Sequence, residues 1–267
     1  MGNQRTLLHI LYLFMKKEES VIEIEINITG QSHFVDELSN LIQLKPTSFW
    51  KKGDLRHFSK HVRVTNPKAL YYQNTVWNYG TGRVPVSHFK EVFGMIKNRF
   101  DDKYRKMINF SQENNLGFRF EVIIIENHIN VPVRFDRECL AWIKKLGIGV
   151  DIDIYRNVVD DEFCESSSIE LVLNVYEEKK TGKIEIYKFT TGKINNMLFE
   201  EICNTYLYGG VTKEMNGLRT CVLEHEVSVL FQIFVKMHDD CTSGIYFDEK
   251  FLLYVNTLQA EVELILE

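Results

Sequence analysis

The stretch Ile22-Glu23-Ile24-Glu25-Ile26-Asn27-Ile28 is the strongest fold signal in the chain, because apolar and polar side chains alternate along it without a break. Side chains of a strand point alternately to opposite faces, so this pattern predicts a strand with one face in a core and the other toward water. Apolar residues at helical spacing follow, with Ser32 as the predicted N-cap and Pro46 beyond their end. The folded part of the chain therefore starts with a strand and then a helix.

Further strands and helices are predicted in the same half of the chain. Extended segments rich in apolar residues lie at Tyr71–Tyr79, Phe118–Glu126 and Val150–Tyr155. The second of these is nearly continuous in hydrophobicity, which predicts a central strand. Helical spacing of apolar residues starts near Ser87 and again after Asp136.

The second half of the chain repeats the order of the first. Ile169-Glu170-Leu171-Val172-Leu173-Asn174-Val175 echoes the stretch 22–28 at an offset of 147 residues (169 − 22). Phe247-Asp248 matches Phe135-Asp136 at an offset of 112 residues (247 − 135), and the apolar positions that follow match as well. We therefore expect an internal duplication, because such segments in one order rarely arise by chance.

The middle of the repeat shows what the second copy lacks. Tyr187–Ile194 matches Trp77–Val84 at an offset of 110 residues (187 − 77), including a Thr-Gly-basic-aliphatic run in each. The offset falls from 147 to 110, so the second copy lacks about 37 residues (147 − 110). These residues are the first helix and the loop Pro46–Asp54. A binding feature in that region is expected in the first copy alone.

We predict an α+β fold of two tandem related units, each a mixed, mainly antiparallel sheet packed by two or three helices. The length of 267 residues fits two small domains. The predicted division is an N-terminal extension, a first unit, a linker and a shortened second unit, at residues 1–19, 20–158, 159–168 and 169–267. The apolar run Leu7–Phe14 is shorter than the roughly 20 residues of a membrane span, so no membrane segment is expected.

Composition makes several function classes less favourable. The net charge is −5, which argues against a general nucleic-acid binder. The five cysteines form no Cys-x-x-Cys pair, which favours reduced thiols in a cytoplasmic protein over a disulfide framework or a zinc ribbon. Nucleophile, metal and nucleotide motifs are absent from the sequence, so no catalytic residue, metal or cofactor is predicted.

Five sequence features together resemble a known family. They are Leu44-Lys45-Pro46-Thr47, Lys52-Gly53-Asp54, Trp77, Phe135-Asp136 and Asp151-Ile152-Asp153-Ile154-Tyr155. Their order is similar to that of the bacterial family called domain of unknown function 4279, over about residues 20–157. The resemblance implies a small α+β fold and a bacterial or phage origin, and it carries no established catalytic residues. The second half keeps the general plan but lacks the loop.

The loop after the first helix is the first candidate binding surface. Its cations are interleaved with aromatic rings and could hold an anion or an acidic partner, although a solvated loop is the alternative. Two histidines lie four residues apart, as in helical metal sites, but only an aspartate is evident as a third ligand. The candidates in this loop are Trp50, Lys51, Lys52, Asp54, Arg56, His57, Lys60 and His61.

Three further residues complete the predicted set. Asp151 and Asp153 are two apart on a predicted strand, so they share one face. Paired carboxylates can share a proton or bind a cation, but the alternation of apolar residues places these two on the solvent side. If the chain is an enzyme or a small-ligand sensor, Trp77 and the loop Trp50–His61 are expected to line a pocket between the two copies.

We expect a non-enzymatic protein-binding module of bacterial or phage origin. An immunity or neutralising, anti-defence protein that masks a toxin or a defence component sterically would fit. The alternative is an enzyme, or a small-ligand or anion sensor, with a pocket between the two units. A pocket with convergent polar groups would favour the alternative, and a flat apolar patch with a polar rim would favour the module.

Overall fold

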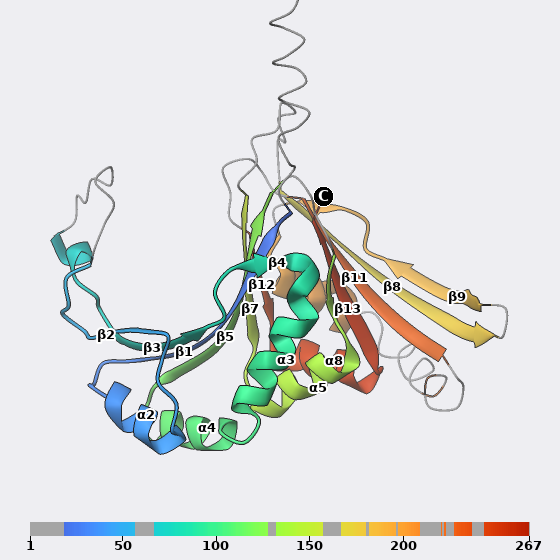
Figure 1. The fold of residues 1–267 in the computed structure, drawn as a ribbon. Coiled ribbons are helices and arrows are strands. Elements are labelled where there is room, and N and C mark those ends of the chain that lie inside the picture. Colours follow the sequence, from blue (N-terminus) through green and yellow to red (C-terminus); the bar gives the residue numbers. More distant parts are fainter. Residues whose placement is uncertain are drawn as a thin grey trace, which may run out of the picture.

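The structure is a computed structural model of the chain. It contains two β-sheets, and the helices and both sheets contribute to one hydrophobic core. In Figure 1 the sheets diverge from the centre of the molecule, and helices lie below both of them. The residues that the structure describes are 19–56, 67–127, 132–156, 167–179, 182–195, 197–208, 220, 222, 227–236 and 243–266.

Within its described residues, the first half forms seven strands with helices between them. Its strands are β1 (Val21–Gly30), β2 (Ser48–Trp50), β3 (Thr75–Gly80), β4 (Val84–Pro85), β5 (Gly117–Glu126), β6 (Val133–Phe135) and β7 (Val150–Arg156). Its α-helices are α2 (Val35–Ile42), α3 (Phe89–Phe100), α4 (Tyr104–Glu113) and α5 (Arg137–Leu146), with 3-10 turns η1 (Pro67–Leu70) and η2 (Val86–His88).

The second half repeats this order with fewer elements. Its strands are β8 (Ser168–Lys179), β9 (Gly182–Thr190), β10 (Ile194–Asn195), β11 (Val227–Lys236), β12 (Ser243–Phe247) and β13 (Ala260–Leu266). Its helices are α6 (Phe199–Ile202), the π-helical turn η3 (Cys203–Tyr208) and α8 (Glu249–Thr257). The strands β8 and β9 are joined through residues 180 and 181. Nothing therefore corresponds to α2 and β2 between them, as the offsets predicted.

One local prediction was wrong, and one helix was not predicted. The helix after β1 starts at Val35 without a side-chain cap, so Ser32 is not its N-cap. The helix predicted near Ser87 is α3, and the unpredicted α4 follows it after a turn at residues 101–103. There the Asp101 carboxylate accepts hydrogen bonds from Trp142 Nε1 (3.2 Å) and Lys145 Nζ (2.9 Å) of α5.

Both sheets are mixed and mainly antiparallel, which confirms the predicted fold class. The first has the order β12-β7-β5-β1-β3-β2, with β4 also beside β1. The second has the order β10-β8-β11-β13-β6, with β9 also beside β8. Only the neighbours β5–β7 and β11–β13 run parallel among these pairs.

The two halves exchange a strand. The strand β6 of the first half pairs with β13, and β12 of the second half pairs with β7. Phe135 lies opposite Val262, and Phe247 lies opposite Val150. Both residues of one pair are 112 positions from their counterparts in the other (247 − 135 and 262 − 150), so the exchange has the same register in both directions.

The same hydrogen bonds occur at matching positions of the two halves. The backbone N–H of Ile24 donates to Thr81 Oγ1 (3.0 Å), and that of Leu171 donates to Thr191 Oγ1 (3.0 Å). The carboxylates of Asp136 and Asp248 cap α5 and α8. Each accepts a hydrogen bond from the backbone N–H three residues later, that of Cys139 (2.9 Å) and that of Phe251 (2.6 Å). The sequence matches therefore mark equivalent structural positions.

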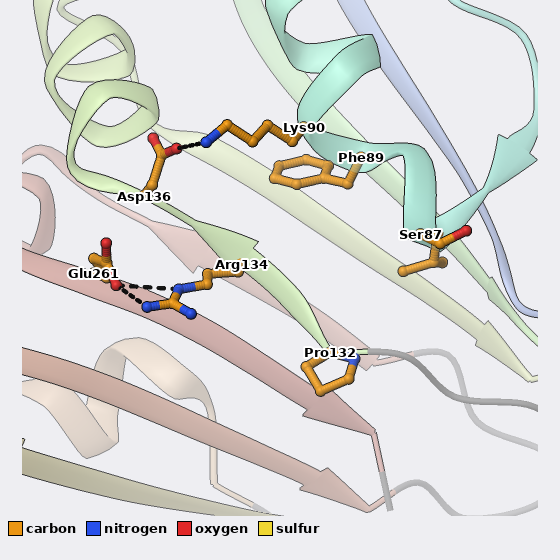
Figure 2. A pocket seen from close by; sticks show the side chains of 8 residues that line it. Ser87, Phe89, Lys90, Pro132, Arg134, Asp136 and Glu261 are labelled. Atoms are coloured by element: carbon orange, nitrogen blue, oxygen red, sulfur yellow. Dashed lines mark hydrogen bonds and ion pairs between the residues drawn. The ribbon is translucent and has the colours of Figure 1, made fainter. Parts of the chain in front are cut away.

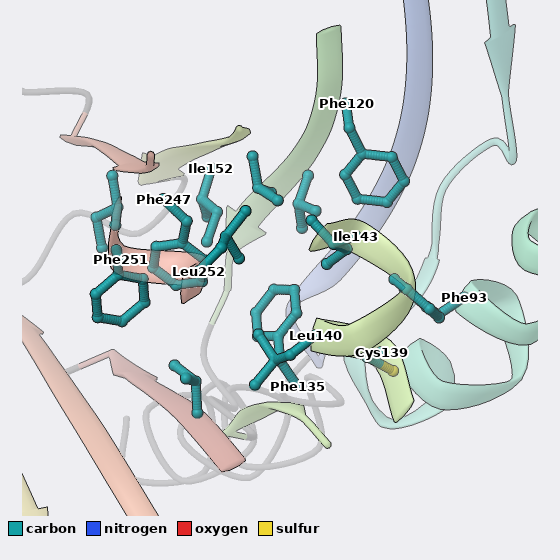
Figure 3. Close-up of a cluster of buried hydrophobic side chains, with 14 of the residues drawn as sticks. Phe93, Phe120, Phe135, Cys139, Leu140, Ile143, Ile152, Phe247, Phe251 and Leu252 are labelled. Atoms are coloured by element: carbon teal, nitrogen blue, oxygen red, sulfur yellow. The ribbon is translucent and has the colours of Figure 1, made fainter. Parts of the chain in front are cut away.

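The core runs through both halves without a boundary. Phe135 and Phe247 meet across the centre with ring centroids 5.6 Å apart, and Phe89 and Phe199 pack on them from equivalent positions (4.9 and 5.6 Å). Figure 3 shows Phe135, Phe247 and residues of α5 and α8 in this cluster. The predicted units 20–158 and 169–267 thus share one core. Of the predicted linker, Ser168 already belongs to β8.

Candidate functional site

The loop at residues 50–56 is held against the segment before β3. The Trp50 ring stacks on Tyr72 with ring centroids 4.8 Å apart, and the Arg56 guanidinium lies over the Tyr72 ring, 5.4 Å from its centre. The Lys52 ammonium donates to the side-chain oxygen of Gln31. These predicted residues do come together, at the β2 edge of the first sheet (Figure 1).

Asp54 stabilises the conformation of this loop through hydrogen bonds. Its carboxylate accepts the Lys51 N–H (2.8 Å), while its carbonyl oxygen accepts the Tyr72 N–H (2.9 Å). Gly53 has φ 90°, a left-handed conformation that favours glycine. The Lys-Gly-Asp run therefore forms a turn. His57, Lys60 and His61 lie outside the described residues.

Trp77 belongs to the core and does not line a surface pocket, which corrects its prediction as a binding residue. It is fully buried under α2, where its indole N–H donates to Ser39 Oγ (3.1 Å). Its strand, β3, lies next to β2 and three strands away from the β7 that meets the second half. The loop and Trp77 consequently do not form a site between the copies.

Asp151 and Asp153 lie on the solvent side of the first sheet, as the alternation predicted. The register continues their row across neighbouring strands. Glu25 lies opposite Glu121, Glu121 opposite Asp151, and Asp151 opposite Tyr246 of the exchanged strand β12. We call this surface the acidic face. It consists of Glu23, Glu25, Glu121, Asp151 and Asp153, with Tyr155 and Tyr246 at its border.

The carboxylates of the acidic face oppose one another's ionisation. Burial raises the pKa of Glu121 above its ordinary value, and the charges of Glu25 and Asp151 add to this effect. Burial also raises the pKa of Asp151, although Arg119 acts in the opposite direction. The buried Asn27 amide offsets part of the repulsion, because its Nδ2 donates to Glu121 (2.7 Å) and Glu25 (3.3 Å).

The second sheet carries the matching network with one decisive difference. Asn174, which is 147 residues after Asn27, donates to Gln232 Oε1 (2.9 Å). Gln232 occupies the position of Glu121 and donates in turn to Glu263 Oε2 (2.8 Å). An amide thus joins the second network, whereas the first places two carboxylates side by side. Sequence reasoning missed both networks, although the offset pairs Asn27 with Asn174.

A cavity of about 320 Å³ opens on the acidic face where β12 joins the sheet. Asp151, Arg119 and Tyr246 line it, together with Phe118 and Gly149. The Tyr246 ring lies so close to Gly149 that a Cβ on this glycine would be 2.3 Å from the phenol oxygen. Glycine is therefore required at position 149 for the ring to take this place.

A second pocket, of about 310 Å³, does lie between the two halves (Figure 2). Lys90 of α3 reaches the Asp136 carboxylate (3.1 Å), and the Arg134 guanidinium pairs with Glu261 of β13. A neighbouring hollow of about 380 Å³ shares Arg134, Asp136 and Glu261, and adds Arg137, Glu138, Lys183 and Ser228. Polar groups converge here, but Lys90 and Arg134 are each engaged by a carboxylate of the protein.

A third cavity, of about 730 Å³, lies between α2 and β2, the two elements that the second half lacks. Leu44, Pro46 and the exposed Phe49 give it an apolar part, and Ser39, Asn40, Gln43 and Lys45 a polar part. Leu44, Lys45 and Pro46 of the family pattern line this cavity, and its charged lining residues, Asp36 and Lys45, have opposite signs.

A metal-ligand cluster or a reactive thiol would be a further kind of chemical site among the described residues. No group of three or more His, Cys, Asp or Glu side chains among them is placed to hold a metal ion. Cys139 is buried, and burial raises the pKa of its thiol to about 12, so the thiolate is scarcely populated at neutral pH. None of the described helices is long and apolar enough to cross a membrane.

The fold and these surfaces define an α+β protein of two strand-exchanged sheets with a charged sheet face. The family model of domain of unknown function DUF4279 matches residues 20–157, and the chain belongs to this family. The match covers the first half, including the acidic face except for Tyr246. No curated protein and no solved structure matches the chain.

Proposed function

We propose that this chain is a non-enzymatic protein-binding module whose acidic face contacts a basic surface of its partner. The observation that supports the proposal is the row of carboxylates across β1, β5 and β7, next to tyrosines that are 44% (Tyr155) and 43% (Tyr246) exposed. Interfaces are enriched in tyrosine, and complementary charge steers partners together.

The chemistry of such a face supports a neutralising role, which we propose for a bacterial or phage protein. Nucleases and other proteins that act on nucleic acids carry basic surfaces, because they must approach phosphates. A rigid acidic sheet face can cover such a surface and block access sterically. We therefore propose an immunity or anti-defence protein that acts in the cytoplasm, where its cysteines stay reduced.

The test compares the wild-type chain with two variants. One combines Glu25→Gln, Glu121→Gln and Asp151→Asn on the acidic face, and the other combines Lys51→Gln and Lys52→Gln in the distant loop. Immobilised chain is used to capture partners from the native host, and each captured protein is purified and assayed alone and with the chain. We expect the chain to inhibit its partner and the acidic-face variant to fail, while the loop variant acts like wild type. Inhibition that is lost only in the loop variant would refute the acidic face as the docking surface.

A sensor for small anions is the second candidate, supported by the pocket between the halves. Arg134, Arg137, Lys90 and Lys183 line it and its neighbouring hollow. Binding there would need an anion to displace Glu261 or Asp136 from its cation. A set of phosphate- and carboxylate-containing metabolites tests this in thermal unfolding, with Arg134→Gln as the control. A rise of the midpoint that the control abolishes would support it.

A further inference from the structure

We propose that the acidic face recognises an arginine side chain of its partner, which lies over Glu121 and Asp151 and against the Tyr246 ring. The inference rests on the proposed protein-binding function and names the chemical group that this surface selects.

The acidic face has a surplus of negative charge that the described protein does not neutralise. Its five carboxylates face two arginines. Arg83 lies 3.9 Å from Glu23, at the outer limit of an ion pair. Arg119 is close enough to Asp151 to affect its ionisation but forms no ion pair within the described part of the chain. A cationic side chain from outside would therefore find unpaired acceptors.

The second sheet has a neutral residue, Gln232, at the position that Glu121 occupies in the first sheet. There an amide, Gln232, accepts from Asn174 and donates to Glu263, so each neighbouring pair in the row contains a donor. In the first sheet Glu121 accepts from Asn27 and has no proton to donate to Asp151 when both are ionised. The missing donor lies between two adjacent strands, about 5 Å apart. A guanidinium, with five N–H donors in a plane, is suited to fill that place.

The exchanged strand provides the remaining contact. Tyr246 stands one residue before Phe247, and the equivalent residue on β6 is Arg134, which pairs with Glu261. The second sheet thus receives from its exchanged strand an arginine that pairs with Glu261, and the first sheet receives a tyrosine at the equivalent position. Tyr246 borders the cavity of about 320 Å³ beside Asp151. Arginine stacks on aromatic rings and pairs with carboxylates at once, which a lysine does less well.

Proton linkage is consistent with this contact. Burial raises the pKa of Glu121 and of Asp151; the charges of Glu25 and Asp151 raise that of Glu121 further, whereas Arg119 acts to lower that of Asp151. The ionised carboxylates of Glu121 and its two neighbours therefore repel one another in the unbound protein. A bound cation relieves this repulsion. Binding should then weaken as the pH falls and these carboxyls take up protons.

The experiment titrates the full chain with the peptide acetyl-Gly-Ser-Arg-Ser-Gly-amide and follows backbone amide shifts in NMR spectra. Peptides with lysine or citrulline in place of arginine are the chemical controls. Glu121→Gln copies the second sheet and should fold, and Glu263→Gln is its matched control on that sheet. We expect the arginine peptide to shift the amides of Gly149 and Tyr246, with weaker effects from lysine and none from citrulline. Glu121→Gln should weaken binding roughly tenfold or more, as expected for a lost charged hydrogen bond.

Equal shifts from the arginine and citrulline peptides, or unchanged affinity in Glu121→Gln, would overturn the inference. Displacement of the peptide by millimolar Ca²⁺ with the same amide shifts would also overturn it, in favour of an inorganic cation site. Failure of this inference is distinct from failure of the proposed function. If the captured partner is inhibited equally by Glu121→Gln, the arginine site is wrong and the binding module stands. If the peptide binds but no partner is inhibited, the arginine site stands and the proposed neutralising function is wrong.

Discussion

Replacing Phe247 by alanine tests whether the two halves fold as one body. Phe247 is fully buried on β12, with ring centroids of Phe135, Phe199 and Phe251 at 5.6, 5.6 and 4.8 Å. Removing a buried phenylalanine costs about 3–5 kcal/mol, from lost transfer free energy and the cavity left behind. A domain is stable by about 5–15 kcal/mol, so this loss should lower the unfolding midpoint strongly.

The assay uses the distribution of tryptophans. All three, Trp50, Trp77 and Trp142, lie in the first half of the chain, whereas Phe247 belongs to the second. Denaturant unfolding is followed by tryptophan fluorescence, which reports the first half, and by far-UV circular dichroism, which reports both. Because β12 completes the first sheet and the core is continuous, Phe247→Ala should shift both curves to the same lower midpoint.

A fluorescence transition that stays at the wild-type midpoint while circular dichroism splits into two steps would refute a shared core. Leu253→Ala is the control, because this α8 residue is 53% exposed and its replacement should change stability by less than about 0.5 kcal/mol. A cycle with Phe135→Ala measures the contact itself. We expect a coupling of about 0.5–1.5 kcal/mol for this edge-to-face pair.

Further predictions concern single sites and one fragment. Gly149→Ala should displace the half-exposed Tyr246 ring at a cost of about 0.5 kcal/mol, and Tyr246→Ala in the same chain should remove that cost in thermal unfolding. Asp248→Ala should cost about 0.5–2 kcal/mol through the lost cap of α8, and Asp248→Asn much less. Glu121 has a raised pKa in the folded state, so it holds its proton more tightly there and stability falls as the pH rises from its unfolded value through the folded one. Glu121→Gln should therefore raise the unfolding midpoint at pH 7 and lose this advantage toward pH 4. Residues 19–157 alone leave β6 and the free edge of β7 unpaired, and should form a dimer by exchanging β6, which light scattering would detect; a monomer with the full sheet signal would contradict this.

The local sequence predicted the elements whose signals are short-range. The alternation at 22–28 corresponds to β1, where the four isoleucines are buried, and the same rule placed Asp151 on the solvent side. Asp136 caps α5, and Gly147 ends it with φ 65°. These features depend on neighbours within a few residues, so the chain itself contains the information. The offsets also predicted that no helix lies between β8 and β9, while the duplication itself stays a prediction.

Which strands pair with each other could not be predicted, because the pairing depends on residues more than a hundred positions apart. Three residues, 133–135, form β6, and nothing in so short a segment indicates that it completes the other half's sheet. Trp77 gave no local sign that α2 covers it, so it was taken for a binding residue. Glu25, Glu121 and Asp151 form a row only because β1, β5 and β7 pair in one particular register. Tyr246 lies next to this row only because β12 of the second half pairs with β7. The sequence by itself determined the strands and helices with a long periodic pattern, such as β1, β5, α3 and α5, and the faces that they bury, whereas the short strand β2 lay in a predicted loop. The tertiary structure decided which edges meet, since burial of the shared aromatic core selects the pairing that covers both halves at once.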